Sequence, residues 1–344
     1  MNDLAIVQRI TRDITDGLLL VDLSGEVVYI NPQGRELLGN PELKEGMKYA
    51  EFMAMDDSEK NDEFHQYVLD SVYDKKKTHV GAIKYICPDG DERYFRMTSS
   101  YLLSENGEEQ FGIILQFADV TKIHNMKVKY EDAVKVLVAL VAVVSVWNII
   151  VAVWAYMEKP VAPETMTVII EVIGVLGTLF ALKFTSITVQ DFGLGKGPDL
   201  KKSFLTDAGL TLILLVLMVV AKLIVQAVRP DIIPPGTPFF HWNKWTMACT
   251  LYPLTVFAQE LLTRGAVQGC LCMVLPEGVP VIVPIVISSV FFGALHIHKG
   301  LFFMLGAMVL LSVFGLIYNK QKTIWGLCIP HYFLGLAMTL IWGA

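Results

Sequence analysis

Two patterns of hydrophobic and polar residues divide the chain near residue 132. Before that point, short apolar runs alternate with polar ones between turn residues, which is typical of strands and short helices. After it, apolar stretches of membrane-spanning length follow one another. Residues 1–132 hold 40 of the 62 Asp, Glu, Lys and Arg side chains, whereas the other 212 residues hold 22. We therefore expect a soluble part followed by a membrane part.

The soluble part begins with a pattern of two strands and a short helix. Residues 18–30 predict two short strands joined by a turn, in which Gly25 supplies the permissive backbone. Asn31 and Pro32 are typical of the start of a helix, so residues 33–38 are expected to be helical.

The next pattern is a helix followed by a three-strand meander. Residues 59–74 are expected to be helical, and the dipeptides Asp89-Gly90 and Asn106-Gly107 are strong hairpin signals. This order of elements resembles a PAS domain over about residues 5–122. The residues that carry the resemblance are the Asp22 turn, Asn31-Pro32, Leu37-Leu38-Gly39 and Asp119-Val120-Thr121.

The resemblance implies an α+β sensory domain over residues 1–122, but its signal is open. A small apolar ligand and a PAS-mediated homodimer without a ligand are both compatible with the sequence. His65 and His79 could ligate haem, although solvated or capping histidines are commoner, and Cys87 lacks the Asn-Cys-Arg-Phe-x-x-Gln setting of a photoactive flavin site. We expect neither haem nor flavin.

Residues 123–157 are predicted to form a signalling helix that continues into the first transmembrane helix. The polar stretch 122–132 contains no Gly or Pro and runs directly into apolar residues. A continuous helix can transmit rotation or tilt, whereas the alternative is a passive helical linker.

The membrane part is predicted to be all-α, with about seven transmembrane helices. The apolar stretches are 133–157, 165–185, 204–227, 246–274, 279–298, 300–318 and 323–343. The stretch 246–274 could instead be broken or re-entrant, which would change the topology. The loops with most lysines, before the third and the seventh stretch, lie inside if the N-terminal domain is cytoplasmic. We therefore expect a multi-pass cell-membrane protein with its PAS-like domain in the cytoplasm.

Charge and cysteine content exclude other classes. The net charge is −6, and no basic run is longer than residues 75–77, so we expect no nucleic-acid partner. Four of the five cysteines lie in apolar segments, which argues against disulfides and zinc knuckles. The N-terminus carries charged residues without a continuous apolar stretch, so no secretory signal peptide is expected.

Charged residues within the apolar stretches are candidates for function. Such a side chain near the bilayer centre costs about 2.5–3.5 kcal/mol on insertion scales. Glu260 and Arg264 lie one helical turn apart, so they can partly neutralise each other, either at a functional site or as a structural ion pair. Glu171 and Lys222 are expected to be structural.

Two histidines in later apolar stretches strengthen the case for a site. His296 ends one stretch and His331 lies in the last. A lone histidine on an apolar helix is more often a packing residue, but two of them with Glu260 form a ligand set that suits zinc with an open position for water.

The order and spacing of these residues resemble the CAAX-protease and bacteriocin-processing (CPBP) family of intramembrane metalloproteases. Its members carry Glu-Glu-x-x-x-Arg, Phe-x-x-x-His and His-x-x-x-Asn or Asp on successive helices. The matching residues are Gln259-Glu260-x-x-x-Arg264, Phe292-x-x-x-His296 and His331-x-x-x-Gly335, and Asp191-Phe192-Gly193-Leu194 resembles the family's preceding amphipathic segment. The resemblance covers about residues 165–343, within a protease-like domain of residues 158–344.

Two positions depart from the family's motifs. The first glutamate, which activates water in the family, is Gln259, and a neutral amide cannot be a general base. The final polar residue, which stabilises the oxyanion, is Gly335. Three explanations are open: Glu260 takes over as the base, Gln259 is a silencing substitution, or this branch has lost hydrolysis. His298 becomes a substitute metal ligand only if the helix ends between it and His296.

The sequence therefore predicts a PAS-regulated intramembrane metalloprotease acting on a peptide or membrane-protein substrate. The resemblance implies that His296 and His331 bind or orient zinc and water, that Glu260 is base or ligand, and that Arg264 orients the carboxylates. The rival is a catalytically silent receptor or scaffold that keeps these residues as a polar network. A transporter is disfavoured because no internal repeats are visible.

Overall fold

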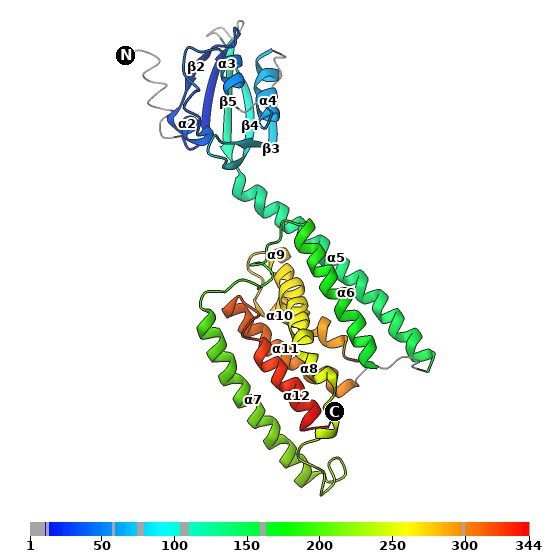
Figure 1. Cartoon of the computed structure of the whole chain (residues 1–344). Helices are drawn as coiled ribbons and strands as arrows, with labels where there is room; N and C mark the ends of the chain where they lie inside the picture. The colour runs from blue at the N-terminus through cyan, green and yellow to red at the C-terminus, as the bar shows by residue number, and fades with distance from the viewer. Residues whose placement is uncertain are drawn as a thin grey trace. The chain divides into compact units, whose positions relative to one another are not determined.

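The computed structural model describes residues 11, 14–56, 59–73, 79–103, 110–158, 163–297 and 300–343. The chain divides into two compact units, Met1–Lys127 and Val128–Ala344 (Figure 1). The predicted class is confirmed: the first unit is α+β and the second is helical.

The first unit is a five-stranded antiparallel sheet with helices packed against it (Figure 1). The spatial order of the strands is β2-β1-β5-β4-β3. The strands are β1 (Gly17–Asp22), β2 (Val27–Ile30), β3 (His79–Ile86), β4 (Glu92–Leu103) and β5 (Gln110–Asp119). The helices are α2 (Pro32–Leu38), α3 (Tyr49–Met55) and α4 (Asp62–Tyr73).

Local sequence signals account for the boundaries of these elements. The Asn31 side chain accepts a hydrogen bond from the Gly34 N–H at 2.8 Å and caps α2, and Gly39 ends that helix with φ 61°. Gly25 and Gly90 have φ values of 78° and 88° in the two predicted turns. These predictions are confirmed, whereas the Asn106-Gly107 turn lies outside the described residues.

Aromatic rings fill the core between the sheet and its helices. Phe64 is fully buried and contacts the rings of Tyr85, Phe95 and Phe117 at centroid distances of 4.9–6.2 Å. Strand β1 alternates buried and half-buried residues, as a sheet with one covered face requires.

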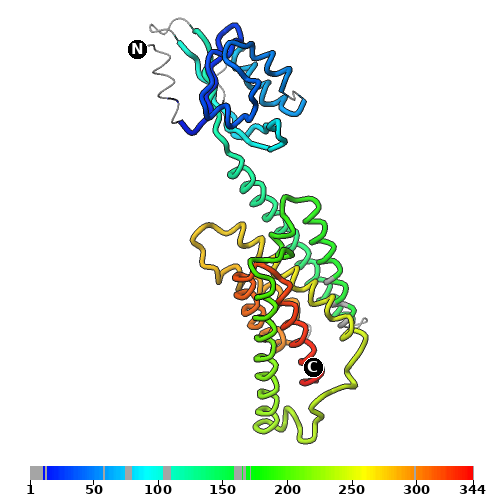
Figure 2. Tube along the Cα trace, turned by 60° about the vertical axis from the view of Figure 1, so that its left-hand side comes forward, coloured from blue at the N-terminus to red at the C-terminus, as the bar shows by residue number. Residues whose placement is uncertain are grey.

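The second unit consists of long helices and their connections. They are α5 (Thr121–Tyr156), α6 (Pro163–Phe184), α7 (Leu200–Val228), a 3₁₀ turn (Trp242–Lys244), α8 (Met247–Glu260), a π-helix (Leu261–Gly269), α9 (Cys270–Val274), α10 (Ile282–Ala294), α11 (Leu301–Gln321) and α12 (Cys328–Leu340). Helix α5 begins in the first unit and is continuous, as predicted. Figures 1 and 2 both show α7 running beside α12, and the two helices are in contact.

Three helices of the described chain, α5, α7 and α11, are long and apolar enough to cross a membrane. Helices α10 and α12 are apolar but shorter. The outer faces of α7, α11 and α12 carry large exposed hydrophobic residues, such as Val216, Val309 and Phe333, as lipid contact requires. The predicted count of seven spans stays a prediction.

The stretch predicted at 246–274 is not one regular α-helix. It changes from α8 to a nine-residue π-helix and then to α9. The predicted stretch 279–298 is also shorter than expected, because α10 ends at Ala294. Single π-turns inside helices are frequent at functional sites.

Candidate functional site

Two predicted site residues meet where α8 and α12 pack together. Glu260, the last residue of α8, is fully buried, and its Oε1 lies 2.7 Å from Nδ1 of His331. Because a carboxylate only accepts, the Nδ1–H donates, and this hydrogen bond selects the tautomer of the ring. The His331 side chain is 13% exposed. Nε2 is therefore the ring nitrogen that can face water or a substrate.

Arg264 holds the other oxygen of Glu260. Its Nε lies 3.4 Å from Oε2, an ion pair without hydrogen-bond geometry. Nη1 donates to Gln268 Oε1 at 2.8 Å, and Nη2 donates to the Leu311 carbonyl at 2.6 Å. Arg264 is fully buried, and Glu260 compensates its charge, while Gln268 of the π-helix and Leu311 of α11 accept from its nitrogens. The predicted contact between Glu260 and Arg264 is confirmed.

Glycines of the π-helix allow a loop backbone to approach the site. A Cβ at Gly265 would lie 2.6 Å from the Phe192 carbonyl oxygen, and one at Gly269 would lie 3.1 Å from the Asp191 carbonyl oxygen. The loop between α6 and α7 therefore packs directly on the segment that carries Arg264.

His296 lies two residues beyond the end of α10. Its Nδ1–H donates to the Phe292 carbonyl at 3.2 Å. His298 lies outside the described residues. Within the described part of the chain, no group of three or more His, Cys, Asp or Glu side chains could hold a metal ion. Arg264 supplies positive charge to Glu260, and zinc at this site stays a prediction.

The two positions that depart from the family's motifs have defined surroundings. Gln259 is buried, and its backbone carbonyl accepts from Thr263 Oγ1 at 2.7 Å. Gly335 lies one turn after His331 in α12, and the Tyr252 side chain occupies the space that a side chain at 335 would need.

Lys222 has a structural arrangement, as predicted. It is buried and donates to the carbonyls of Pro238, Phe239 and Ile341 at 3.1, 3.0 and 2.5 Å. It thereby ties α7 and the following loop to the end of α12. The side chain of Glu171 lies outside the described residues.

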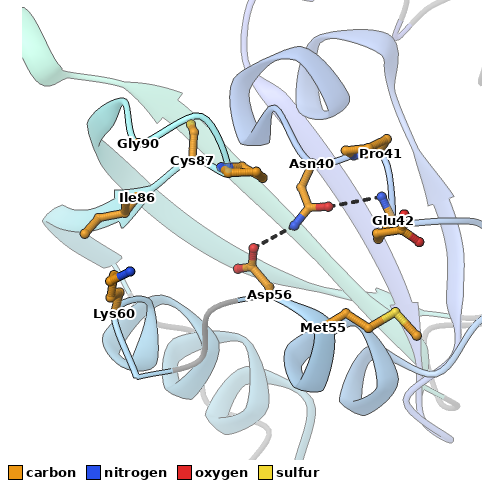
Figure 3. Close-up of a pocket in the computed structure, with 10 residues that line it drawn as sticks. Asn40, Pro41, Glu42, Met55, Asp56, Lys60, Ile86, Cys87 and Gly90 are labelled. Atoms are coloured by element: carbon orange, nitrogen blue, oxygen red, sulfur yellow. Dashed lines mark hydrogen bonds between the residues drawn. The ribbon is translucent and has the colours of Figure 1, made fainter.

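The first unit has a pocket of about 440 Å³ beside the loop between α2 and α3. Figure 3 shows Asn40 in it, with Nδ2 donating to Asp56 and Oδ1 accepting from the Glu42 N–H. The lining residues are Asn40, Pro41, Glu42, Met55, Asp56, Lys60, Ile86, Cys87, Pro88 and Gly90. This pocket is the candidate ligand site of the first unit.

Asp56 is the centre of a buried hydrogen-bond network next to this pocket. Its carboxylate accepts from Asn40 at 2.6 Å and from Asn61, His65 and Tyr85 at 3.0 Å each. Burial would raise its pKa, but the hydrogen bonds from His65, Asn61, Asn40 and Tyr85 lower it below the ordinary value of 3.8.

His65 is part of this network. Its Nδ1 lies 2.9 Å from the Tyr49 hydroxyl, so both ring nitrogens have partners. The side chain of His79, the other histidine considered for haem, lies outside the described residues. Cys87 is buried, and burial raises the pKa of its thiol.

Asp56→Asn is expected to destabilise the first unit by about 3 kcal/mol, because an amide turns its N–H groups toward the donors Asn61 and His65. Because the folded-state pKa of Asp56 is lowered, its ionised carboxylate stabilises the fold at pH values above the unfolded-state pKa. This stabilisation is lost as the pH falls through the folded-state pKa, which lies below 3.8. Hydrogen exchange of β3 and α4 in the full-length protein measures both effects.

The matched control is Asp89→Asn. Asp89 is exposed and accepts one hydrogen bond, from the Asp91 N–H, which an amide oxygen can also accept. Equal exchange in the two variants would contradict a central role for Asp56.

Sequence reasoning missed two buried polar residues of the second unit. Gln268 lies one turn after Arg264 and donates to the Gly315 carbonyl at 3.1 Å. Asp207 is fully buried in α7, and its Oδ1 accepts from Gln321 at 2.9 Å. Polarity within an apolar stretch was the available signal for both.

Two family models match separate parts of the chain. A family model described as type II CAAX prenyl endopeptidase Rce1-like matches residues 241–337, and a PAS domain model matches residues 15–122. No curated protein matches the chain.

The similar solved structures include PAS and light-oxygen-voltage domains. The PAS domain of a protein from Colwellia psychrerythraea is 19% identical, with 35% of this chain and 99% of that chain covered and a TM-score of 0.28. An RNA-binding light-oxygen-voltage receptor is 17% identical, with 34% and 33% covered and a TM-score of 0.27. The PAS domain of the fruit-fly ELK potassium channel is 13% identical, with 35% and 99% covered and a TM-score of 0.29. The chain thus spans about a third of the receptor.

Proposed function

Because the chain joins a PAS domain to a membrane domain of the type II CAAX prenyl endopeptidase Rce1-like family, we propose that it is an intramembrane endopeptidase controlled by its PAS domain. The observation that carries the proposal is the hydrogen bond of 2.7 Å between Glu260 and His331 beside Arg264. A buried carboxylate that orients a partly exposed imidazole is an arrangement for moving a proton.

In this proposal His331 is the base and Glu260 orients it. Both oxygens of Glu260 are held, one by His331 and one by Arg264, and the carboxylate is fully buried. Water attacks the scissile carbonyl carbon while Nε2 of His331 takes its proton. The same nitrogen then returns the proton to the leaving amine as the C–N bond breaks. Gln259 takes no proton, and no step passes through a metal.

The proposed orientation places the PAS domain in the cytoplasm. The two lysine-rich loops lie at the same end of the second unit, because Thr323 Oγ1 donates to the Gly195 carbonyl at 2.8 Å and the Ile324 N–H to the Gly193 carbonyl at 3.0 Å. Residue Lys129 of α5 also binds at this end, to Asp191 at 2.9 Å. The positive-inside rule assigns this end to the cytoplasm.

Helix α5 is the proposed route of control. Within the first unit, Thr121 Oγ1 accepts from the Tyr94 N–H at 2.9 Å, and the His124 ring stacks on Tyr94 at 3.8 Å. Changes in the PAS sheet therefore act directly on the first turn of α5.

Within the second unit, α5 holds the loop that lies on the π-helix. Lys129 pairs with Asp191, and Asp132 accepts from the Ser186 N–H at 2.8 Å. Since the carbonyls of Asp191 and Phe192 lie against the glycines of the π-helix, movement of α5 would shift the segment that carries Arg264.

The test is cleavage of a fluorogenic farnesylated peptide ending in a Cys-a-a-X sequence, by full-length protein in lipid nanodiscs. We expect the wild type to cleave it and Glu260→Gln to be at least 100-fold slower, since an amide can turn its N–H groups to the imidazole. Glu277→Gln, at an exposed carboxylate, is the matched control and should cleave normally. A wild type without activity that becomes active in Gln259→Glu would favour the silent receptor or scaffold instead.

Asp132→Ala is expected to loosen the loop on the π-helix. Loss of the acceptor leaves the Ser186 N–H unpaired, so hydrogen exchange of residues 185–194 should rise and cleavage should slow less than about tenfold. The control is the exposed neighbour Glu131→Ala. Unchanged exchange in Asp132→Ala would remove this contact from the proposed route.

A further inference from the structure

The Tyr252 side chain lies in a space that Gly335 leaves open, one helical turn after His331 in α12. A Cβ built on Gly335 would lie 2.5 Å from the Tyr252 ring carbon Cζ, and Oη and Cε1 would be closer still. Gly335 follows His331 by four residues in α12, so both lie on one face of that helix. Tyr252 comes from α8, which also carries Glu260 and packs against α12.

Peptide hydrolysis needs a hydrogen-bond donor beyond Arg264 and His331, whose nitrogens have other roles. Negative charge develops on the scissile carbonyl oxygen when water adds, and a donor held near that oxygen stabilises it. Arg264 directs its nitrogens to Glu260, Gln268 and the Leu311 carbonyl. His331 uses Nδ1 for Glu260 and, in the proposed function, Nε2 for the proton of water.

We propose that Tyr252 is a further catalytic residue, whose hydroxyl donates to the scissile carbonyl oxygen, and that Gly335 is glycine because the phenol needs its space. The inference rests on the proposed function. A phenol O–H is a suitable donor, and Tyr252 is only half-buried, so a substrate can reach it. The ring of Tyr252 packs against α12 at Gly335, which restricts the position of its hydroxyl.

Tyr252→Phe in the farnesylated-peptide assay is the first test. It removes one oxygen and keeps the ring, so we expect kcat to fall about 100-fold with KM and thermal midpoint nearly unchanged. The matched control is Tyr332→Phe, whose ring centroid lies 6.0 Å from that of Tyr252 and which should keep full activity.

Gly335→Ala supplies an independent test, because its methyl group must displace the same phenol. It should lose about as much kcat as Tyr252→Phe, and the double variant should lose no more than either single one. If the loss of kcat in the double variant equalled the product of the two single losses, a shared role of Tyr252 and Gly335 would be overturned.

Replacing Tyr252 with 3-fluorotyrosine separates donation from packing. The more acidic phenol should move the alkaline limb of the kcat profile to lower pH, which a packing role would not do. If wild type cleaves and depends on His331 but Tyr252→Phe keeps kcat within twofold, only the role of Tyr252 is overturned. If the wild type does not cleave, with or without restored activity in Gln259→Glu, the proposed function fails and this inference fails with it.

Discussion

Replacing His331 with alanine is expected to lower kcat for the farnesylated peptide by about 1,000-fold, with little change in KM. The variant loses the nitrogen that takes the proton of water and leaves Glu260 buried without its hydrogen bond. Because the two residues act as a unit, Glu260→Gln/His331→Ala should be no slower than the worse single variant. Steady-state kinetics of the full-length protein in nanodiscs measure these effects.

The control for His331→Ala is Tyr332→Phe, at the next residue of α12. Zinc content is measured in the same preparations. The wild type could contain stoichiometric zinc that both His296→Ala and His331→Ala lose. This result would contradict a metal-free base and support the metalloprotease predicted from the sequence.

The PAS domain could be predicted because its signals are local. Asn31 caps the helix that begins one residue later, and Gly39 and Gly90 turn the chain where their own conformational freedom allows it. The Asp56 network could not be predicted, because its donors come from elements far apart in the sequence, such as Asn40 and Tyr85.

The membrane site was predicted only as far as neighbours along one helix allow. Spacing placed Glu260 beside Arg264, but the π-helix that follows depends on tertiary packing, including the approach of the Phe192 carbonyl to Gly265. The contact between Glu260 and His331 joins residues 71 positions apart. The resemblance suggested that they share a site, but not which atoms meet.

The contact of Tyr252 with Gly335 had no sequence signal at all. A glycine in an apolar helix has many explanations, and only the fold shows which side chain fills the space it leaves.

Arg264→Ala is expected to destabilise the membrane domain by about 3–5 kcal/mol, because it leaves the fully buried Glu260 carboxylate without its cation. It also leaves Gln268 Oε1 and the Leu311 carbonyl without the guanidinium that they bind. Resistance to unfolding by SDS in mixed micelles measures the loss. Arg229→Ala is the matched control, since its ion pair with Asp231 is about 60% exposed and its loss should leave the resistance to unfolding nearly unchanged.

The double variant Glu260→Gln/Arg264→Leu separates stability from catalysis. It removes both buried charges, so it should recover much of the stability that Arg264→Ala loses. A single buried charge without a partner destabilises the fold more than the removal of both charges does. It should nevertheless remain inactive, since His331 then has no carboxylate to accept from Nδ1. If the double variant were no more stable than Arg264→Ala, neutralising Glu260 would not be the role of Arg264. If it were stable and active, the Glu260–His331 pair would be structural, which is the arrangement a silent receptor would keep.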